Sequence, residues 1–234
     1  MSLLKVNSLR VMIGQYAVLH DVSFSVPEGG VFVLLGRNGA GKTTTLRTLM
    51  GLWKAQPGAV MFRGKDISSR HCADIARLGI AYVPENMGIF GSLTVEENMR
   101  LATRNRGFDD SRLRRVFALF PALERLWKMR AGLLSGGQKQ MLSVARAIIE
   151  PRDLILVDEP TKGLAPTVVQ DIQKTFAEIS RHTTILLVEQ NFAFAAALGR
   201  HLAVIEDGIS VHQGRMADFV ADESLRHKLL GLSA

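Results

Sequence analysis

Three glycines, a lysine and a threonine lie close together at residues 36–43, which read GRNGAGKT directly after the apolar run at 31–35. Glycines let backbone N–H groups approach phosphate oxygens closely, and the start of a helix adds a favourable dipole. Lys42 would reach the outer phosphates of a nucleotide, and the hydroxyl of Thr43 would ligate Mg²⁺. The residues predicted to bind the nucleotide here are Gly36, Arg37, Asn38, Gly39, Ala40, Gly41, Lys42, Thr43 and Thr44.

A second candidate site lies at the end of the sequence LILVDE, residues 154–159. Four apolar residues predict a buried strand, and α/β sheets bind ligands at the carboxyl ends of their strands. Asp158 is placed to hold the Mg²⁺ shell, and Glu159 to polarise a water that attacks the γ-phosphate. Many strands end in Asp-Glu at a surface, so this pattern alone does not indicate a function. It indicates a catalytic site here because a phosphate-binding sequence lies upstream.

A third motif, LSGGQ at 134–138, lies just before a predicted helix. A serine hydroxyl and two glycine N–H groups at a helix N-terminus form another possible anion site. Alone, the same residues would describe an ordinary serine N-cap followed by flexible glycines. The residues concerned are Ser135, Gly136, Gly137 and Gln138.

The three motifs in this order closely resemble the ABC-type ATPase family, and the resemblance covers essentially the whole chain. It implies an α/β fold, a P-loop NTPase core with an N-terminal antiparallel β part and a helical subdomain insertion. It also implies a head-to-tail dimer in which residues 135–138 contact ATP held by the partner chain. ATP hydrolysis would then drive integral membrane permease subunits, without direct contact between this chain and the transported solute.

Several positions depart from the commonest family pattern. Glu85 stands where glutamine is usual, on a segment (81–98) resembling the loop that joins core and insertion and meets Mg²⁺. Ile13 stands where an aromatic residue commonly stacks on adenine. Tyr16 is the nearest aromatic residue, and it either stacks on the base or is simply a core or strand residue.

Gln190 stands where the family usually has a histidine that contacts the γ-phosphate. Its amide can donate a hydrogen bond but cannot become cationic. We therefore expect a slower but live ATPase, with Glu159, Gln190 and Lys42 as its catalytic residues. The alternatives are a dead site or a non-catalytic ATP-sensing subunit that relies on a catalytic partner.

Three segments, VPE with GIFGSLTVEEN, DEPTKGLAP and LLVEQN, together resemble one branch of the family. This branch contains the ATP-binding subunits of branched-chain or hydrophobic amino acid importers, which typically carry two different ATPases. The chain resembles the second, smaller one, dimerising with itself or with a paralogous ATPase. Urea or short amides are alternative cargoes. A soluble ABC ATPase acting on DNA or ribosomes is disfavoured, since no long coiled-coil insertion or second ATPase domain is present.

The elements that must position these residues follow from the hydrophobic spacing. Short apolar runs at 22–26, 31–35 and 60–62 predict strands, whereas 93–150 has helical spacing that starts with a Thr94–Glu97 capping box. After Pro151, strand, helix and strand alternate, and a hairpin turns at Asp207-Gly208. We expect one ABC ATPase domain over 1–234, with a core lobe at about 1–88 and 152–234 and a helical signature subdomain at about 89–151.

Composition supports a globular protein, with 47% hydrophobic residues among 234 and a single cysteine, Cys72. No apolar run approaches the 18 residues of a membrane span, so we expect a cytoplasmic protein. The resemblance to importer ATPases further implies that it is peripheral on the inner face of the cell membrane. The net charge is +7, and the segment 100–130 alone supplies +6. That segment is either a solvated helical face, a membrane-facing surface or, with no supporting motif, a nucleic-acid site. Its basic residues are Arg100, Arg104, Arg106, Arg112, Arg114, Arg115, Arg125, Lys128 and Arg130.

Overall fold

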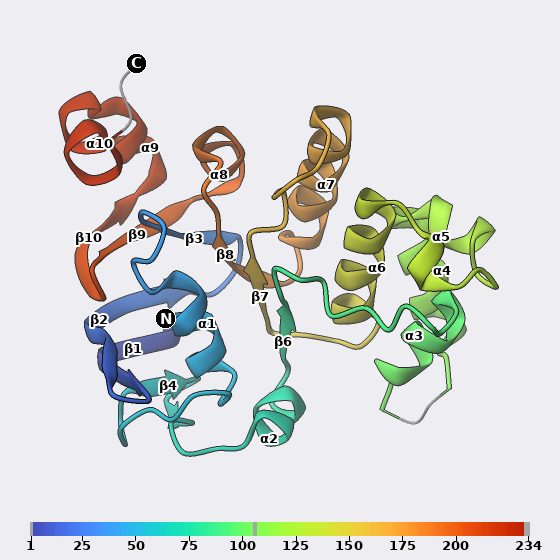
Figure 1. Ribbon diagram of the computed structural model, residues 1–234, viewed down its shortest axis with the longest axis horizontal. Helices are drawn as coiled ribbons and strands as arrows, with labels where there is room; N and C mark the ends of the chain where they lie inside the picture. The colour runs from blue at the N-terminus through green and yellow to red at the C-terminus, as the bar shows by residue number, and fades with distance from the viewer. Residues whose placement is uncertain (1, 105–106, 232–234) are drawn as a thin grey trace.

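The computed structural model describes residues 2–104 and 107–231. Its centre is one curled sheet with the strand order β5-β4-β1-β2-β10-β9-β3-β8-β7-β6 (Figure 1). The sheet confirms the α/β fold predicted from the sequence. Its strands are β1 (Ser2–Ile13), β2 (Tyr16–Pro27), β3 (Val31–Leu35), β4 (Val60–Phe62), β5 (Lys65–Asp66), β6 (Ile80–Val83), β7 (Leu154–Asp158), β8 (Thr184–Val188), β9 (His201–Glu206) and β10 (Ile209–Arg215).

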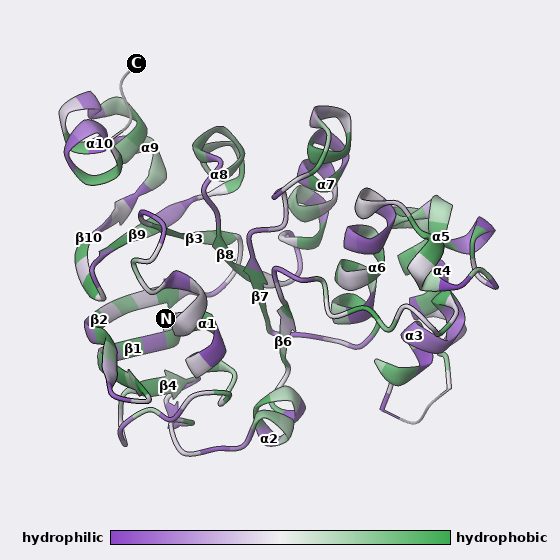
Figure 2. Ribbon diagram, viewed as in Figure 1, coloured by the Kyte–Doolittle hydropathy of each residue, from purple (hydrophilic) through white to green (hydrophobic). Residues whose placement is uncertain are grey.

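The strands that carry the site are parallel and buried. β3 pairs with β8 on one side and with β9 on the other, and β7 pairs with β8 and β6. All five residues of β3, β7 and β8 are buried, which matches their unbroken apolar sequences. In Figure 2 these strands are among the most hydrophobic parts of the ribbon. The carboxyl ends of these parallel strands therefore lie along the same side of the sheet.

The N-terminal part is antiparallel. β1 pairs with β2 and with β4, and β4 pairs with β5. This part joins the rest of the sheet through β2 and β10, which share one register pair, Ile209 with Asp21. Side chains reinforce that junction, because Ser210 and Gln213 accept hydrogen bonds from the backbone N–H groups of Ser23 and Ser25 at 2.9 and 3.2 Å.

Helices pack on both faces of the sheet and form a separate group beyond β6 and β7 (Figure 1). That group includes α3, whose capping box between Thr94 and Glu97 confirms the predicted start. The helices are α1 (Lys42–Leu49), α2 (Cys72–Arg77), α3 (Val95–Leu101), α4 (Asp110–Leu119), α5 (Pro121–Arg125), α6 (Gly136–Ile148), α7 (Pro166–Ile179), α8 (Phe192–Leu198), α9 (Met216–Ala221) and α10 (Glu223–Leu230), with a 3₁₀ turn η1 (Ala131–Leu133).

One predicted boundary was wrong. Residues 81–98 were expected to be a connecting loop, but Ile80–Val83 form the edge strand β6, paired in parallel with β7. The strand has only four residues, and the polar hydroxyl of Tyr82 interrupts its apolar sequence. A pattern this short does not distinguish a strand from an apolar loop. The hairpin at Asp207-Gly208 forms as predicted, between β9 and β10.

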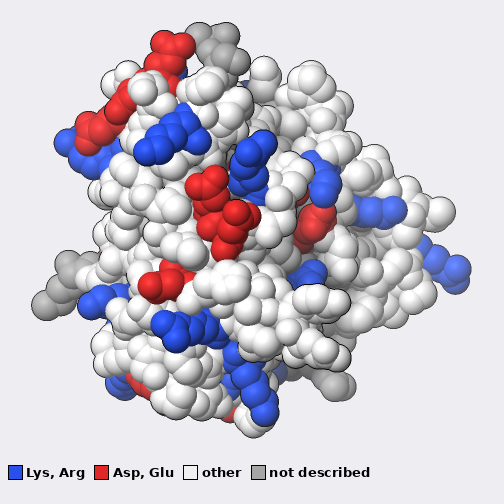
Figure 3. Space-filling view, turned by 60° about the vertical axis from the view of Figure 1, so that its left-hand side comes forward, with Lys and Arg blue, Asp and Glu red and all other residues white. Residues whose placement is uncertain are grey.

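The basic segment at 100–130 is partly neutralised by neighbouring acids. Glu96 pairs with Arg100 and Lys128, and Glu150 pairs with Arg112 at 2.5 Å. Arg106 lies outside the described residues. On the face shown in Figure 3, acidic and basic side chains are interspersed. The ion pairs of Glu96 and Glu150 support the solvated-face interpretation of the charge at 100–130. No helix within residues 2–104 and 107–231 is long and apolar enough to cross a bilayer.

Candidate nucleotide-binding site

The loop between β3 and α1 is tightly packed against its neighbours. Gly36 has φ +150°, and a Cβ built on it would lie 2.2 Å from the carbonyl oxygen of Ile205. Gly41 has φ +102°, and its Cβ would lie 2.4 Å from the side chain of Leu19. Only glycine fits these two positions without moving backbone or core. The loop is thus held between β9, which contains Ile205, and β2, which contains Leu19, directly before α1 begins at Lys42.

Lys42 is buried at the base of this loop. Its Nζ donates to the carbonyl oxygens of Gly36 and Arg37 at 2.8 and 3.0 Å. Burial lowers the pKa of Lys42, and the carboxylates of Glu159, Asp158 and Glu189 oppose that shift. Lys42 is thus held within the loop by two carbonyl oxygens, with three carboxylates close enough to oppose the effect of its burial.

Thr43 and Asp158 come together from α1 and β7. The Thr43 hydroxyl donates to Oδ1 of Asp158 at 3.0 Å, and the hydroxyl of Tyr82 donates to Oδ2 at 3.0 Å. Burial raises the pKa of Asp158, while these two hydrogen bonds favour its carboxylate. Mg²⁺ in nucleotide sites takes one or two protein oxygens together with phosphates and water. A hydroxyl beside a buried carboxylate fits that ion, although the residues that the structure describes contain no cluster of three His, Cys, Asp or Glu able to hold a metal.

Glu159 follows β7 and is only 9% exposed. Its φ is +45°, in the left-handed region that non-glycine residues rarely occupy. Its N–H donates to the carbonyl of Val188 at 2.9 Å, which extends the β7–β8 pairing by one residue. The side-chain amide of Gln190 donates to Oε1 of Glu159 at 2.5 Å. The structure thus brings Gln190, placed beyond the end of β8, into direct contact with Glu159.

Glu189 supports this arrangement, and the sequence analysis did not assign it a role. It is 2% exposed. One carboxylate oxygen accepts from the N–H and hydroxyl of Thr161 at 3.1 and 2.5 Å. The other accepts from the N–H groups of Gln190 and Asn191, both at 2.8 Å. Glu189 therefore ties the turn after β7 to the end of β8. Its position beside Gln190 was the available signal, since a glutamate that ends a buried strand needs partners.

The remaining predicted residues lie away from this cluster. Ser135 caps α6, accepting from the N–H of Gln138 at 3.3 Å, while the Gln138 side chain accepts from the N–H of Ser135 at 2.9 Å. Helix α6 lies on the far side of β6 and β7 from α1 (Figure 1). Within the described residues, no hydrogen bond joins residues 135–138 to the loop at 36–44. Gly136 and Gly137 occupy the first turn of the same helix.

Two predictions about individual side chains gain detail. Glu85, predicted near Mg²⁺, forms an ion pair with Lys162 at 2.6 Å. Tyr16 begins β2 and is 80% exposed, so it is a strand residue outside the core, and stacking on adenine stays a prediction. The nearby residues Val18 and Leu19 contact the phosphate-binding loop at Gly41, which puts the start of β2 beside that loop.

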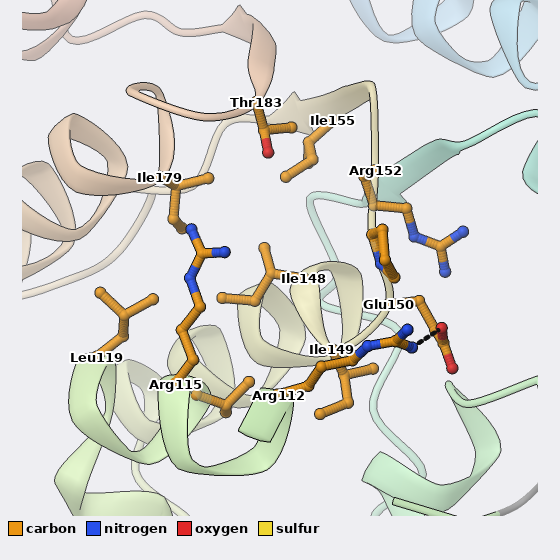
Figure 4. A pocket seen from close by; sticks show the side chains of 12 residues that line it. Arg112, Arg115, Leu119, Ile148, Ile149, Glu150, Arg152, Ile155, Ile179 and Thr183 are labelled. Atoms are coloured by element: carbon orange, nitrogen blue, oxygen red, sulfur yellow. Dashed lines mark hydrogen bonds and ion pairs between the residues drawn. The ribbon is translucent and has the colours of Figure 1, made fainter. Parts of the chain in front are cut away.

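Two cavities differ in their distance from the phosphate loop. One of about 230 Å³ lies against the loop and the end of β8, lined in part by Gly36, Asn38, Glu189 and Gln190. A smaller one of about 120 Å³ lies where α4 and α6 meet β7 and α7. Figure 4 shows its aliphatic side chains facing arginines, with Arg112 paired to Glu150. It shares no residue with the phosphate loop, whereas the larger of these two cavities borders that loop.

Comparison with known proteins agrees with this geometry. The family model described as ABC transporter matches residues 19–162. The chain is 36% identical over 232 residues to the high-affinity branched-chain amino acid transport ATP-binding protein BraG of Pseudomonas aeruginosa, covering 98% of this chain and 100% of the relative. It is 33% identical to the probable branched-chain amino acid transport ATP-binding protein LivF of Archaeoglobus fulgidus, covering 90% and 89%. Among solved structures, an ATP-binding cassette of an ABC transporter in its ADP conformation superposes with a TM-score of 0.81 at 26% identity, covering 96% of this chain and 97% of that one.

Proposed function

The chain belongs to the ABC transporter family of ATP-binding proteins, and from that premise we propose that it hydrolyses ATP to power an importer of branched-chain or other hydrophobic amino acids. The observation that carries the hydrolytic part is the convergence of Lys42, Thr43, Asp158 and Glu159 at one edge of the sheet. The cargo follows from the full-length similarity to BraG. Permease subunits would hold the chain at the inner face of the membrane.

In this proposal the residues share the work of hydrolysis. Lys42 and the loop N–H groups bind the phosphates, and Thr43 and Asp158 would hold Mg²⁺, with Glu85 as a further predicted contact. Mg²⁺ would neutralise phosphate charge when bound. Glu159 orients and polarises the attacking water, and Gln190 holds the glutamate through Oε1. Because an amide keeps this contact without a positive charge, we propose a slower but active ATPase.

A second copy, or a paralogous ATPase, would complete the site. The signature residues Ser135, Gly136, Gly137 and Gln138 cap a helix whose N-terminus favours anions. They make no hydrogen bond to their own chain's phosphate loop within the described residues, which supports a role toward ATP held by a partner. The core lobe of one chain (about 1–88 and 152–234) and the helical subdomain of the other (about 89–151) would then contact opposite faces of the same nucleotide.

Phosphate release from Mg²⁺-ATP tests the proposal. We expect specific activity to rise with protein concentration, since two chains form each site, and to vanish in Glu159→Gln. Activity that persists in Glu159→Gln would exclude Glu159 as the base. Absence of activity at every concentration, with ATP still bound, would favour the ATP-sensing alternative or an obligatory catalytic partner. For the cargo, co-reconstituted permease should couple hydrolysis to leucine import and not to urea import.

A further inference from the structure

Lys162 lies between two carboxylates that come from different parts of the chain. Its Nζ is 2.6 Å from Oε1 of Glu85, beyond the end of β6, and 3.5 Å from Oε2 of Glu159. The backbone N–H of Lys162 also donates to the carbonyl of Glu159 at 3.3 Å. The ammonium is therefore held on the same turn as the carboxylate that it contacts.

These contacts engage both oxygens of the Glu159 carboxylate. Gln190 donates to Oε1, and Lys162 approaches Oε2. A carboxylate held at one oxygen only can still rotate about its terminal bonds, whereas contacts at both oxygens fix its plane. The plane matters because a general base must point one lone pair at the attacking water.

The charges around Glu159 explain why a cation is needed at this place. Asp158, Glu189 and Glu85 bring three further carboxylates to the neighbourhood, while Lys42 is committed to the phosphate-binding loop. Glu85 adds a negative charge at a position where the ABC-type ATPases usually have a neutral glutamine. The pKa of Lys162 is raised, first by its hydrogen bond to Glu85 and then by the charges of Glu85 and Glu159.

We propose that Lys162 is a positioning residue for ATP hydrolysis, holding Oε2 of Glu159 and linking that carboxylate to Glu85 on the loop between β6 and α3. The inference rests on the proposed function. Lys162 does not touch the reacting atoms; it acts by orienting Glu159. Through Glu85, a displacement of the loop that leads into the helical group changes how firmly Glu159 is held.

The test compares four variants of the full chain with wild type, by steady-state phosphate release. Lys162→Met removes the ammonium and should lower kcat about tenfold, which is a small part of the rate enhancement that a positioned general base contributes. The KM for ATP should change less than about twofold. Lys162→Arg keeps a cation and should recover most of kcat. The double variant Glu85→Lys with Lys162→Glu keeps an ion pair between these positions but puts a carboxylate beside Glu159, so it should be at least as impaired as Lys162→Met. Lys174→Met, which removes an exposed lysine on α7, is the matched control.

Hydrogen exchange of residues 158–165 in the nucleotide-free protein gives a readout independent of turnover. Lys162→Met should speed exchange in this segment, and Lys174→Met should not. Unchanged exchange, or a kcat of Lys162→Met equal to that of the control, overturns the inference. A wild-type kcat in the double variant Glu85→Lys with Lys162→Glu also overturns the inference. The ion pair between positions 85 and 162 would then be sufficient for full turnover, without a cation beside Glu159. Glu159→Gln is assayed alongside: if it retains turnover, the role proposed for Glu159 as the base fails as well, and if wild type itself shows no turnover, the proposed hydrolytic function fails. A silent Glu159→Gln with an unimpaired Lys162→Met refutes this inference alone.

Discussion

Replacing Gln190 by alanine removes the amide that donates to Oε1 of Glu159 at 2.5 Å. A hydrogen bond to a charged group contributes about 1.5–3 kcal/mol, and about 1.4 kcal/mol corresponds to a tenfold change in rate. Gln190 is exposed, although Glu159 is only 9% exposed, so water can replace part of the contact. We therefore expect the lower end of the range, a fall in kcat of about tenfold, with KM for ATP nearly unchanged.

The assay is phosphate release at saturating Mg²⁺-ATP, with Gln190→His as the conservative partner. Histidine can donate to the same carboxylate and can carry charge, so this variant should match or exceed wild type. Gln170→Ala, on the exposed side of α7, controls for loss of an amide elsewhere. A Gln190→Ala enzyme with wild-type kcat would refute the reasoning, because Glu159 would then be oriented without Gln190.

Three further outcomes are expected. Removing Mg²⁺ with a chelator should abolish phosphate release, because Thr43 and Asp158 alone offer too few ligands to retain the ion. Added Mg²⁺ should restore release, and release that continues in the chelator would contradict the proposed Mg²⁺ site. Thr94→Ala breaks the capping box of α3 and should lower the free energy of unfolding in urea by about 1 kcal/mol, compared with an exposed Thr167→Ala control. Hydrogen bonds from Lys128 and then Arg100 hold the pKa of Glu96 below its ordinary 4.5. The stability that this gives is present above pH 4.5 and is lost as pH falls through the lowered pKa, so Glu96→Gln should lose less stability than wild type on acidification.

The sequence was sufficient for the elements that hold the phosphate site. The strands at 31–35, 154–157 and 185–188 are unbroken apolar runs, and such runs are buried on both faces of a parallel sheet. The glycine pattern at 36–41 requires one loop geometry, which makes that loop predictable. The capping box at Thr94 was similarly clear, because its two hydrogen bonds join residues only three positions apart.

Contacts between distant residues could not be predicted in the same way. Glu85 and Lys162 are far apart in sequence, and nothing local to either indicates that they pair. The contact of Tyr82 was unpredictable for the same reason, since its hydrogen bond to Asp158 depends on the pairing of β6 with β7. Glu189 was recognisable as a polar residue that ends a buried strand, but its contacts with Thr161 depend on the turn after Glu159.

The pairing of β3 has a consequence for the synthesis of the chain. β3 is complete at Leu35, but its two neighbours begin only at Thr184 and His201. At about 5–20 residues per second, a ribosome would need about 8–30 s to add the intervening residues. Throughout that interval the apolar strand that leads into the phosphate loop has no partner in the sheet, whereas the β1–β2 hairpin can close early. Aggregation of unfinished chains, or their capture by chaperones, is therefore expected to involve residues 31–35.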